Sequence, residues 1–347
     1  MRRRRMRRDA PAAGLGGARR QIAYPIGHQY DGLARHRAKE AQMPRLFDID
    51  GENLEPGFVN LRAAVSPFEQ ELQALIEAMW TVYEPYADPD FRLGFARDVD
   101  GRFWEMYLGQ ALLASGKVLL PTAERQREGG QPDLCIVDEG RRVWIEAIAP
   151  DEGQGPDRLI RPVPINEGGG LAAVPVREAQ LRTTSALWTK TQKLSRYLAQ
   201  GVIAPNEPRI IAISASRFGV YVPERPLPMI MNCVFPIGDA FVTVDQAGEI
   251  VGEGFHASIA IARQNGVVPR TAFLDPTFAH VSGVLWSRVG IGNLDRATRP
   301  LTFVHNPTAD VGLPARWGAW DREFFTTREG DQWQAEDLLA EPEGLAP

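Results

Sequence analysis

Apolar residues recur at helical spacing in three segments of the chain. In the first segment, Ser66 and Glu69 have the spacing of a capping box and Pro67 occupies the first helical position, so a helix is predicted to about Tyr83. The other two segments end at glycines, as helices often do. They predict helices over about 102–115 and 177–200.

Shorter runs rich in apolar and β-branched residues predict strands. In the first part of the chain they lie at 117–123, 133–137, 142–148 and 208–216. The order helix, three strands, helix, strand predicts an α/β domain with a mixed sheet. A strand-rich C-terminal extension follows, with strands predicted over 229–237, 240–245, 271–287 and 300–307. The pattern leaves open whether this extension continues the same sheet or forms a second domain.

The charge distribution sets the N-terminus apart from the rest of the chain. The net charge is −5, yet the chain opens with MRRRRMRR. This basic stretch is typical of a disordered tail, of a start codon placed upstream of Met43, or of a nucleic-acid-binding arm. The chain is thus interpreted as a tail, a helical segment, an α/β core and the C-terminal extension, over 1–42, 43–99, 100–216 and 217–347.

Two acids lie within the strand pair QPDLCIVDEGRRVWIEAIAP, which spans 131–150. A turn at 139–140 pairs residues whose numbers sum to 279, and this register places Asp133 opposite Glu146. Opposed side chains share a face with Cβ atoms about 4.5–5.5 Å apart, so the two carboxylates repel unless a cation or a proton neutralises them. Carboxylate oxygens are the ligands that Mg²⁺ prefers.

A third acid, Glu105, lies on the apolar stripe of the 102–115 helix with Leu108 and Leu112. A buried glutamate needs a partner, and a shared metal is one such partner. The simpler alternative is that Glu105 pairs with an arginine and that Asp133 only opens a strand after Pro132.

This arrangement resembles the PD-(D/E)XK nuclease superfamily, which has the restriction-endonuclease-like fold. Its core is a helix, a three-stranded meander, a helix and a further strand, and the resemblance covers about residues 100–216. Pro132 and Asp133 match the first element of the signature, Glu146 matches the acid of the second, and Glu105 matches the helix glutamate of many members.

The chain departs from this family where the signature has lysine, since Ile148 stands two residues after Glu146. In some members that lysine migrates to the following helix. On the 177–200 helix, Lys190 is our first candidate and Lys193, four residues before Tyr197, is the second. The alternative is that both lysines are solvated on the flank of the helix.

The resemblance implies a Mg²⁺-dependent endonuclease, with Mn²⁺ as a possible substitute, that hydrolyses phosphodiester bonds, most plausibly in DNA. Glu105, Asp133, Glu146 and the carbonyl of Ala147 would hold the metal, while Lys190 or Lys193 orients the attacking water. Arg182 is a candidate phosphate contact or else a surface salt bridge. The rival hypotheses are a catalytically inactive nuclease-fold module that binds nucleic acid or assembles complexes, and an unrelated α/β enzyme whose acids pair with arginines.

The remaining features of the sequence bear on the location of the protein, on its partners and on the role of single residues. No stretch approaches the roughly 18–20 apolar residues of a membrane span, so we expect a cytoplasmic protein without a membrane partner. The resemblance leaves open a monomer or a homodimer. Cys135 and Cys233 are expected to be small core residues. Gly168 to Gly170 would border the site. His305, Trp188 and Trp286 are each interpreted mainly as structural, with base stacking as the alternative for the tryptophans.

Overall fold

Two of the helices before the sheet begin at residues whose side chains cap them. In the computed structural model, which describes residues 44–125, 130–160, 174–219, 222, 224–329 and 332–340, α3 has both halves of the predicted capping box between Ser66 and Glu69. The side chain of Asp98 accepts a hydrogen bond from the N–H of Gly101, so α5 starts a few residues earlier than predicted. These elements are α2 (Pro56–Ala63), α3 (Pro67–Tyr83), η3 (Glu84–Tyr86), α4 (Phe91–Arg97) and α5 (Val99–Ala114).

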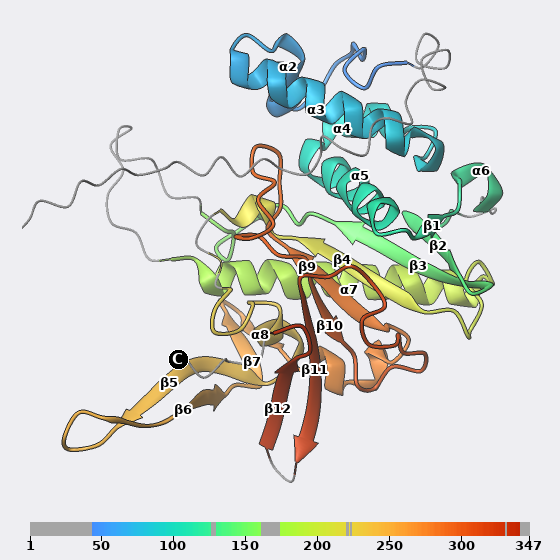
Figure 1. The fold of residues 1–347 in the computed structure, drawn as a ribbon. Helices are drawn as coiled ribbons and strands as arrows, with labels where there is room; N and C mark the ends of the chain where they lie inside the picture. Colours follow the sequence, from blue (N-terminus) through green and yellow to red (C-terminus); the bar gives the residue numbers. More distant parts are fainter. Residues whose placement is uncertain are drawn as a thin grey trace, which may run out of the picture. The chain divides into compact units, whose positions relative to one another are not determined.

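Strands from both halves of the chain form one sheet (Figure 1). Over the described ranges it has eight strands in the order β1-β2-β3-β4-β9-β10-β11-β12. The C-terminal strands therefore continue the sheet of the predicted core, and the described residues from 44 onward form one compact unit. The strands are β1 (Val118–Leu119), β2 (Leu134–Asp138), β3 (Arg141–Ile148), β4 (Arg209–Ser214), β9 (Gly283–Ser287), β10 (Thr302–His305), β11 (Arg322–Glu329) and β12 (Gln332–Asp337).

The sheet is mixed, as the element order predicts. β1, β2 and β3 form an antiparallel meander, after which α7 (Val176–Ala199) leads to β4, which runs parallel to β3. β9 pairs with β4 in parallel. β10 pairs with β9 antiparallel and with β11 in parallel, and β11 pairs with β12 antiparallel. The α/β class with a mixed sheet is therefore confirmed.

Two strand predictions in the C-terminal extension are wrong in part. The 229–237 run folds mainly as a short helix, α8 (Met231–Val234), and only its last residue enters a strand. The 271–287 run begins with two helical turns, η6 (Ala272–Leu274) and η7 (Pro276–Phe278), because Asp275 caps the second turn through the N–H of Thr277. The strand predicted over 117–123 is also shorter than expected, because α6 (Thr122–Arg125) begins within the predicted range.

Two hairpins stand outside the large sheet. β5 (Ile237–Val244) pairs with β6 (Ile250–Ala257), and β7 (Ala260–Arg263) pairs with β8 (Gly266–Pro269). One further turn, η5 (Ser216–Phe218), follows β4. The second hairpin contacts α7, and it forms one wall of a cavity described below.

Apolar side chains cover both faces of the sheet, with α5 on one face and α7 on the other (Figure 1). Along β3, Val143 and Ile145 pack on the α5 side, whereas Trp144 packs on the α7 side. This alternation directs Glu146 toward α7. Cys135 and Cys233 are buried and free, as expected of small core residues.

The predicted tail over 1–42 and the glycines at 168–170 lie outside the described residues. Within the described ranges, no helix has the length and apolar character needed to cross a bilayer.

Candidate active site

The turn between β2 and β3 sets the position of the two strand acids. Glu139 and Gly140 have φ values of +48° and +78°, which suits a tight two-residue hairpin turn. Leu134 pairs with Ile145, and the residue numbers of every pair between β2 and β3 sum to 279, so the predicted register is confirmed. Asp133 directly precedes the paired residues, and its Oδ2 accepts a hydrogen bond of 2.7 Å from the N–H of Ala147. The acid is thereby held at the end of the strand pair, beside Glu146.

Two lysines of α7 contact these acids. Lys190 Nζ lies 2.7 Å from Glu146 Oε1 and 3.7 Å from Asp133 Oδ2. Lys193 Nζ lies 2.5 Å from the same Glu146 oxygen. The burial of Leu187 and Leu194 sets the rotation of the helix that turns these lysines toward β3. The alternative in which both lysines are solvated on the helix flank is therefore wrong.

Tyr197, one turn beyond Lys193, completes this face of α7. Its hydroxyl donates a hydrogen bond of 2.9 Å to the carbonyl of Gln131, and Lys193 Nζ lies 5.7 Å from its ring centroid. This contact holds the segment that leads into Asp133 against the helix.

The electrostatic environments of the two strand acids differ. Glu146 is fully buried, and burial followed by the nearby charge of Asp133 raises its pKa to about 7, against the opposing effect of the two lysines. Burial also opposes ionisation of Asp133, but Lys190, Lys193 and the Ala147 N–H outweigh it, and the pKa of Asp133 is lowered. One oxygen of Glu146, Oε2, is buried and has no hydrogen-bond partner among the described residues.

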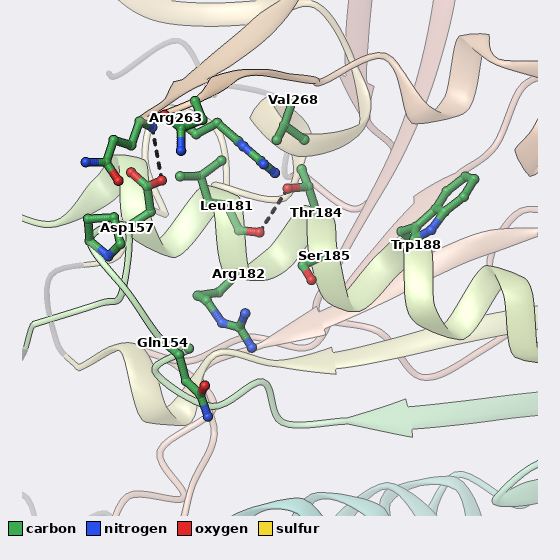
Figure 2. A pocket seen from close by; sticks show the side chains of 13 residues that line it. Gln154, Asp157, Leu181, Arg182, Thr184, Ser185, Trp188, Arg263 and Val268 are labelled. Carbon is green, nitrogen blue, oxygen red and sulfur yellow. Dashed lines mark hydrogen bonds between the residues drawn. The ribbon is translucent and has the colours of Figure 1, made fainter.

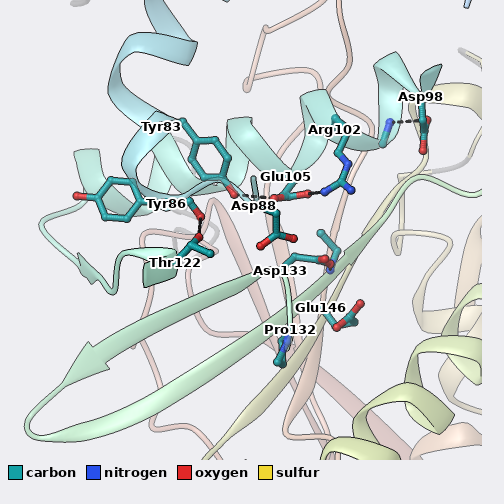
Figure 3. A network of polar contacts seen from close by, with 12 residues as sticks. Tyr83, Tyr86, Asp88, Asp98, Arg102, Glu105, Thr122, Pro132, Asp133 and Glu146 are labelled. Carbon is teal, nitrogen blue, oxygen red and sulfur yellow. Dashed lines mark hydrogen bonds and ion pairs between the residues drawn. The ribbon is translucent and has the colours of Figure 1, made fainter. Parts of the chain in front are cut away.

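Glu105 approaches the site from the α5 side of the sheet (Figure 3). Its Oε1 accepts a hydrogen bond of 2.8 Å from the hydroxyl of Tyr83, and its Oε2 lies 2.8 Å from a guanidinium nitrogen of Arg102. Burial, and then the charge of Asp133, raises the pKa of Glu105 to about 8. The simpler alternative, in which Glu105 pairs with an arginine, is what the structure shows.

Sequence reasoning missed three residues of this network. Arg102 stands three residues before Glu105, so helical spacing could have identified it. Tyr83 and Asp88 carry no such signal, because they belong to α3 and to the loop after it. Asp88 lies 4.0 Å from Arg125, and burial raises its pKa, with a further contribution from Asp133.

The structure does not gather the three predicted acids into one cluster. Within the described ranges, no three His, Cys, Asp or Glu side chains are close enough to hold one metal ion. Glu105 is occupied by Tyr83 and Arg102, whereas Asp133 and Glu146 share Lys190. The carboxylates available to a common cation are therefore those of Asp133 and Glu146.

The remaining candidates have mainly structural contacts. Arg182 forms the predicted surface salt bridge, 2.5 Å from Asp151. His305 Nε2 lies 2.7 Å from the buried Glu323, as expected of a structural histidine. Trp286 is buried, but Trp188 is 49% exposed.

Comparisons with protein-family models, curated proteins and solved structures found no match to this chain. Its function must therefore be inferred from the geometry of the site.

Proposed function

We propose that the chain is a Mg²⁺-dependent nuclease with a restriction-endonuclease-like core. The convergence of Lys190 and Lys193 on Glu146, beside Asp133, carries this proposal. The two lysines would supply the cation that this chain lacks at position 148, where the family signature has lysine and this chain has Ile148. The order α5, β1, β2, β3, α7, β4, with the short helix α6 between β1 and β2 and with β3 and β4 parallel, supports the resemblance on which the proposal rests.

The donor set fits a magnesium ion held by two carboxylates. Mg²⁺ is commonly bound by one or two carboxylates, with water molecules and substrate phosphates completing its coordination. Asp133 and Glu146 are such a pair, and Oε2 of Glu146 is a buried acceptor to which no described residue donates a hydrogen bond. The Ala147 carbonyl is the further ligand implied by the family. When bound, the ion would lower the pKa of a water molecule and neutralise charge on the phosphate.

The side chains of this chain would hold and orient the reacting groups. Lys190, whose side chain is 13% exposed, sits between the two carboxylates and is placed to orient a water molecule and to stabilise charge on the phosphate. Lys193, at 31%, is more accessible and would contact the substrate from the open side. The hydrogen bond from Ala147 to Asp133 keeps that carboxylate in place, which is the rigidity that a metal ligand needs.

One observation favours a second candidate function, an inactive module that binds nucleic acid. Glu146 Oε1 already has two ammonium partners, so the site is partly neutralised without a metal. Such an ion-paired cluster would support the fold without supporting hydrolysis.

Cleavage of single- and double-stranded DNA and RNA, with Mg²⁺, Mn²⁺ or EDTA, tests the proposal. We expect metal-dependent cutting that Asp133→Asn abolishes. Asp50→Asn, which changes a fully exposed carboxylate, should cut like the wild type. A wild-type protein that cuts no substrate with either metal, yet binds nucleic acid, would establish the inactive module instead.

A further inference from the structure

A cavity of about 490 Å³ lies beside α7, between the 151–160 loop and the β7–β8 hairpin (Figure 2). Pockets of about 300–1,000 Å³ are typical of sites for small molecules or single groups of a larger ligand. Its wall carries polar and aromatic side chains, among them Gln154, Arg182, Trp188, Arg263, Gln264 and Asn265.

Trp188 offers an aromatic surface to this cavity. Its side chain is 49% exposed, although its ring centroid lies 6.0 Å from that of Phe278. Trp188 also lines a second, smaller cavity of about 200 Å³, so this residue borders two hollows. An accessible ring of this kind is a platform on which a planar group can stack.

The charges of the cavity wall favour an anion. Its charged residues are Arg182, Arg263 and Asp157, a net positive charge in a chain whose net charge is −5. The carboxylate of Asp157 already has two donors: its Oδ1 lies 2.8 Å from Nη1 of Arg177, and its Oδ2 accepts a hydrogen bond of 3.0 Å from the N–H of Gln264. Arg182 contacts Asp151 through Nε and Nη2, and its Nη1 makes no hydrogen bond to a described residue.

The same helix carries both this cavity wall and the lysines of the proposed active site. Arg182 and Lys190 are eight residues apart on α7, about 12 Å along its axis. A nucleic-acid strand lying along α7 could therefore reach both groups. The amide side chains of Gln154, Gln264 and Asn265 offer donors and acceptors for the edge of a base.

We propose that the cavity binds an unpaired base of a single-stranded nucleic acid, stacked on Trp188, with the adjoining phosphates at Arg182 and Arg263. The placement of that strand rests on the proposed nuclease function. Bases in a duplex are paired and stacked, so they cannot enter the cavity, and the site therefore prefers single strands.

Fluorescence anisotropy with labelled single-stranded DNA, single-stranded RNA and a DNA duplex, all in EDTA, tests this inference. Trp188→Ala is expected to weaken single-strand binding about tenfold or more, and Trp188→Phe about threefold or less, since phenylalanine can also stack. Arg263→Ala should reduce the salt dependence of binding. Arg62→Ala, on α2 and remote from α7, removes the same charge and should bind like the wild type.

Melting temperatures of the variants confirm that each is folded. Single-strand affinity unchanged in Trp188→Ala, equal losses for duplex and single strand, or no single-strand binding by the wild type would each overturn the cavity assignment. Cleavage with Mg²⁺ is measured separately. If binding depends on Trp188 but no cleavage occurs, base binding in the cavity is supported and the nuclease function is rejected. If the protein cleaves but Trp188→Ala binds like the wild type, the nuclease function is supported and base binding in the cavity is rejected.

Discussion

Lys190 and Glu146 are 44 residues apart in the chain, yet Nζ and Oε1 of the two side chains are 2.7 Å apart. The crossover from β3 through α7 to the parallel strand β4 brings the helix over the strand. A lysine of the following helix thus contacts the acid of β3 directly. Lys190 and Lys193 both reach Glu146 from α7, so single substitutions can separate the contributions of the two lysines.

Lys190→Ala should lower the single-turnover cleavage rate about 10²-fold or more, the usual effect of removing a group that stabilises developing charge. Lys193→Ala should have a smaller effect, because Lys193 is more exposed and its only ion pair in the described structure is with Glu146. Rates measured at saturating Mg²⁺ compare the two. A larger loss for Lys193→Ala would show that Lys193 is the principal cation.

Metal binding should be visible without turnover, as a rise in melting temperature when Mg²⁺ or Mn²⁺ is added. A ligand at a hundredfold excess over its Kd stabilises the folded state by about 2.7 kcal/mol. Asp133→Asn should abolish the shift. Glu105→Gln should retain most of it, because Glu105 is held by Tyr83 and Arg102. Loss of the shift in both variants would instead favour a three-acid site.

Gly109 allows α3 and α5 to approach each other. A Cβ atom on Gly109 would lie 2.4 Å from Cε2 of the fully buried Tyr83, so Gly109→Ala must displace that ring and its hydrogen bond to Glu105. Overpacking of this kind costs about 1–3 kcal/mol. Urea denaturation should report this loss. The matched variant Gly57→Ala, whose Cβ would meet no atom closer than 4.0 Å, should be at least as stable as the wild type.

His305 should make stability depend on pH. Burial lowers its pKa from 6.5, although Glu323 opposes this effect, so below pH 6.5 the unfolded chain binds more protons than the folded chain. Stability is therefore retained above pH 6.5 and is lost as the pH falls toward the lowered pKa.

His305→Gln, which can still donate to Glu323, should lose less stability between pH 7.5 and pH 5 than the wild type does. His280, whose pKa burial also lowers, is present in both proteins and cancels in the comparison. Parallel melting curves for the two proteins across this range would contradict the assignment.

The parts of the fold that follow local rules could be predicted from the sequence. The turn at Glu139 and Gly140 determines the register that brings Asp133 beside Glu146. The 3.6-residue period of α7, anchored by its buried leucines, places Lys190 on the side facing β3.

Contacts between distant segments could not be predicted in this way. Nothing near Tyr83 or Asp88 in the sequence indicates that they adjoin Glu105 and Asp133, because packing between α3 and α5 decides it. The helix at Met231 replaces a predicted strand for a related reason. Its apolar residues are buried on all sides, and a fully buried run has no period that separates strand from helix.

The sheet position of β3 has a consequence for backbone motion. β3 is hydrogen-bonded on both edges, to β2 and β4, and is covered on both faces, so its amides can exchange with solvent only through large-scale opening. The β7–β8 hairpin has two strands and stands outside the large sheet, so it can open locally. Amide protons near Glu146 should therefore exchange slowly, while those of the β7–β8 hairpin exchange quickly. The acidic centre is then rigid, and one wall of the neighbouring cavity can adapt its shape.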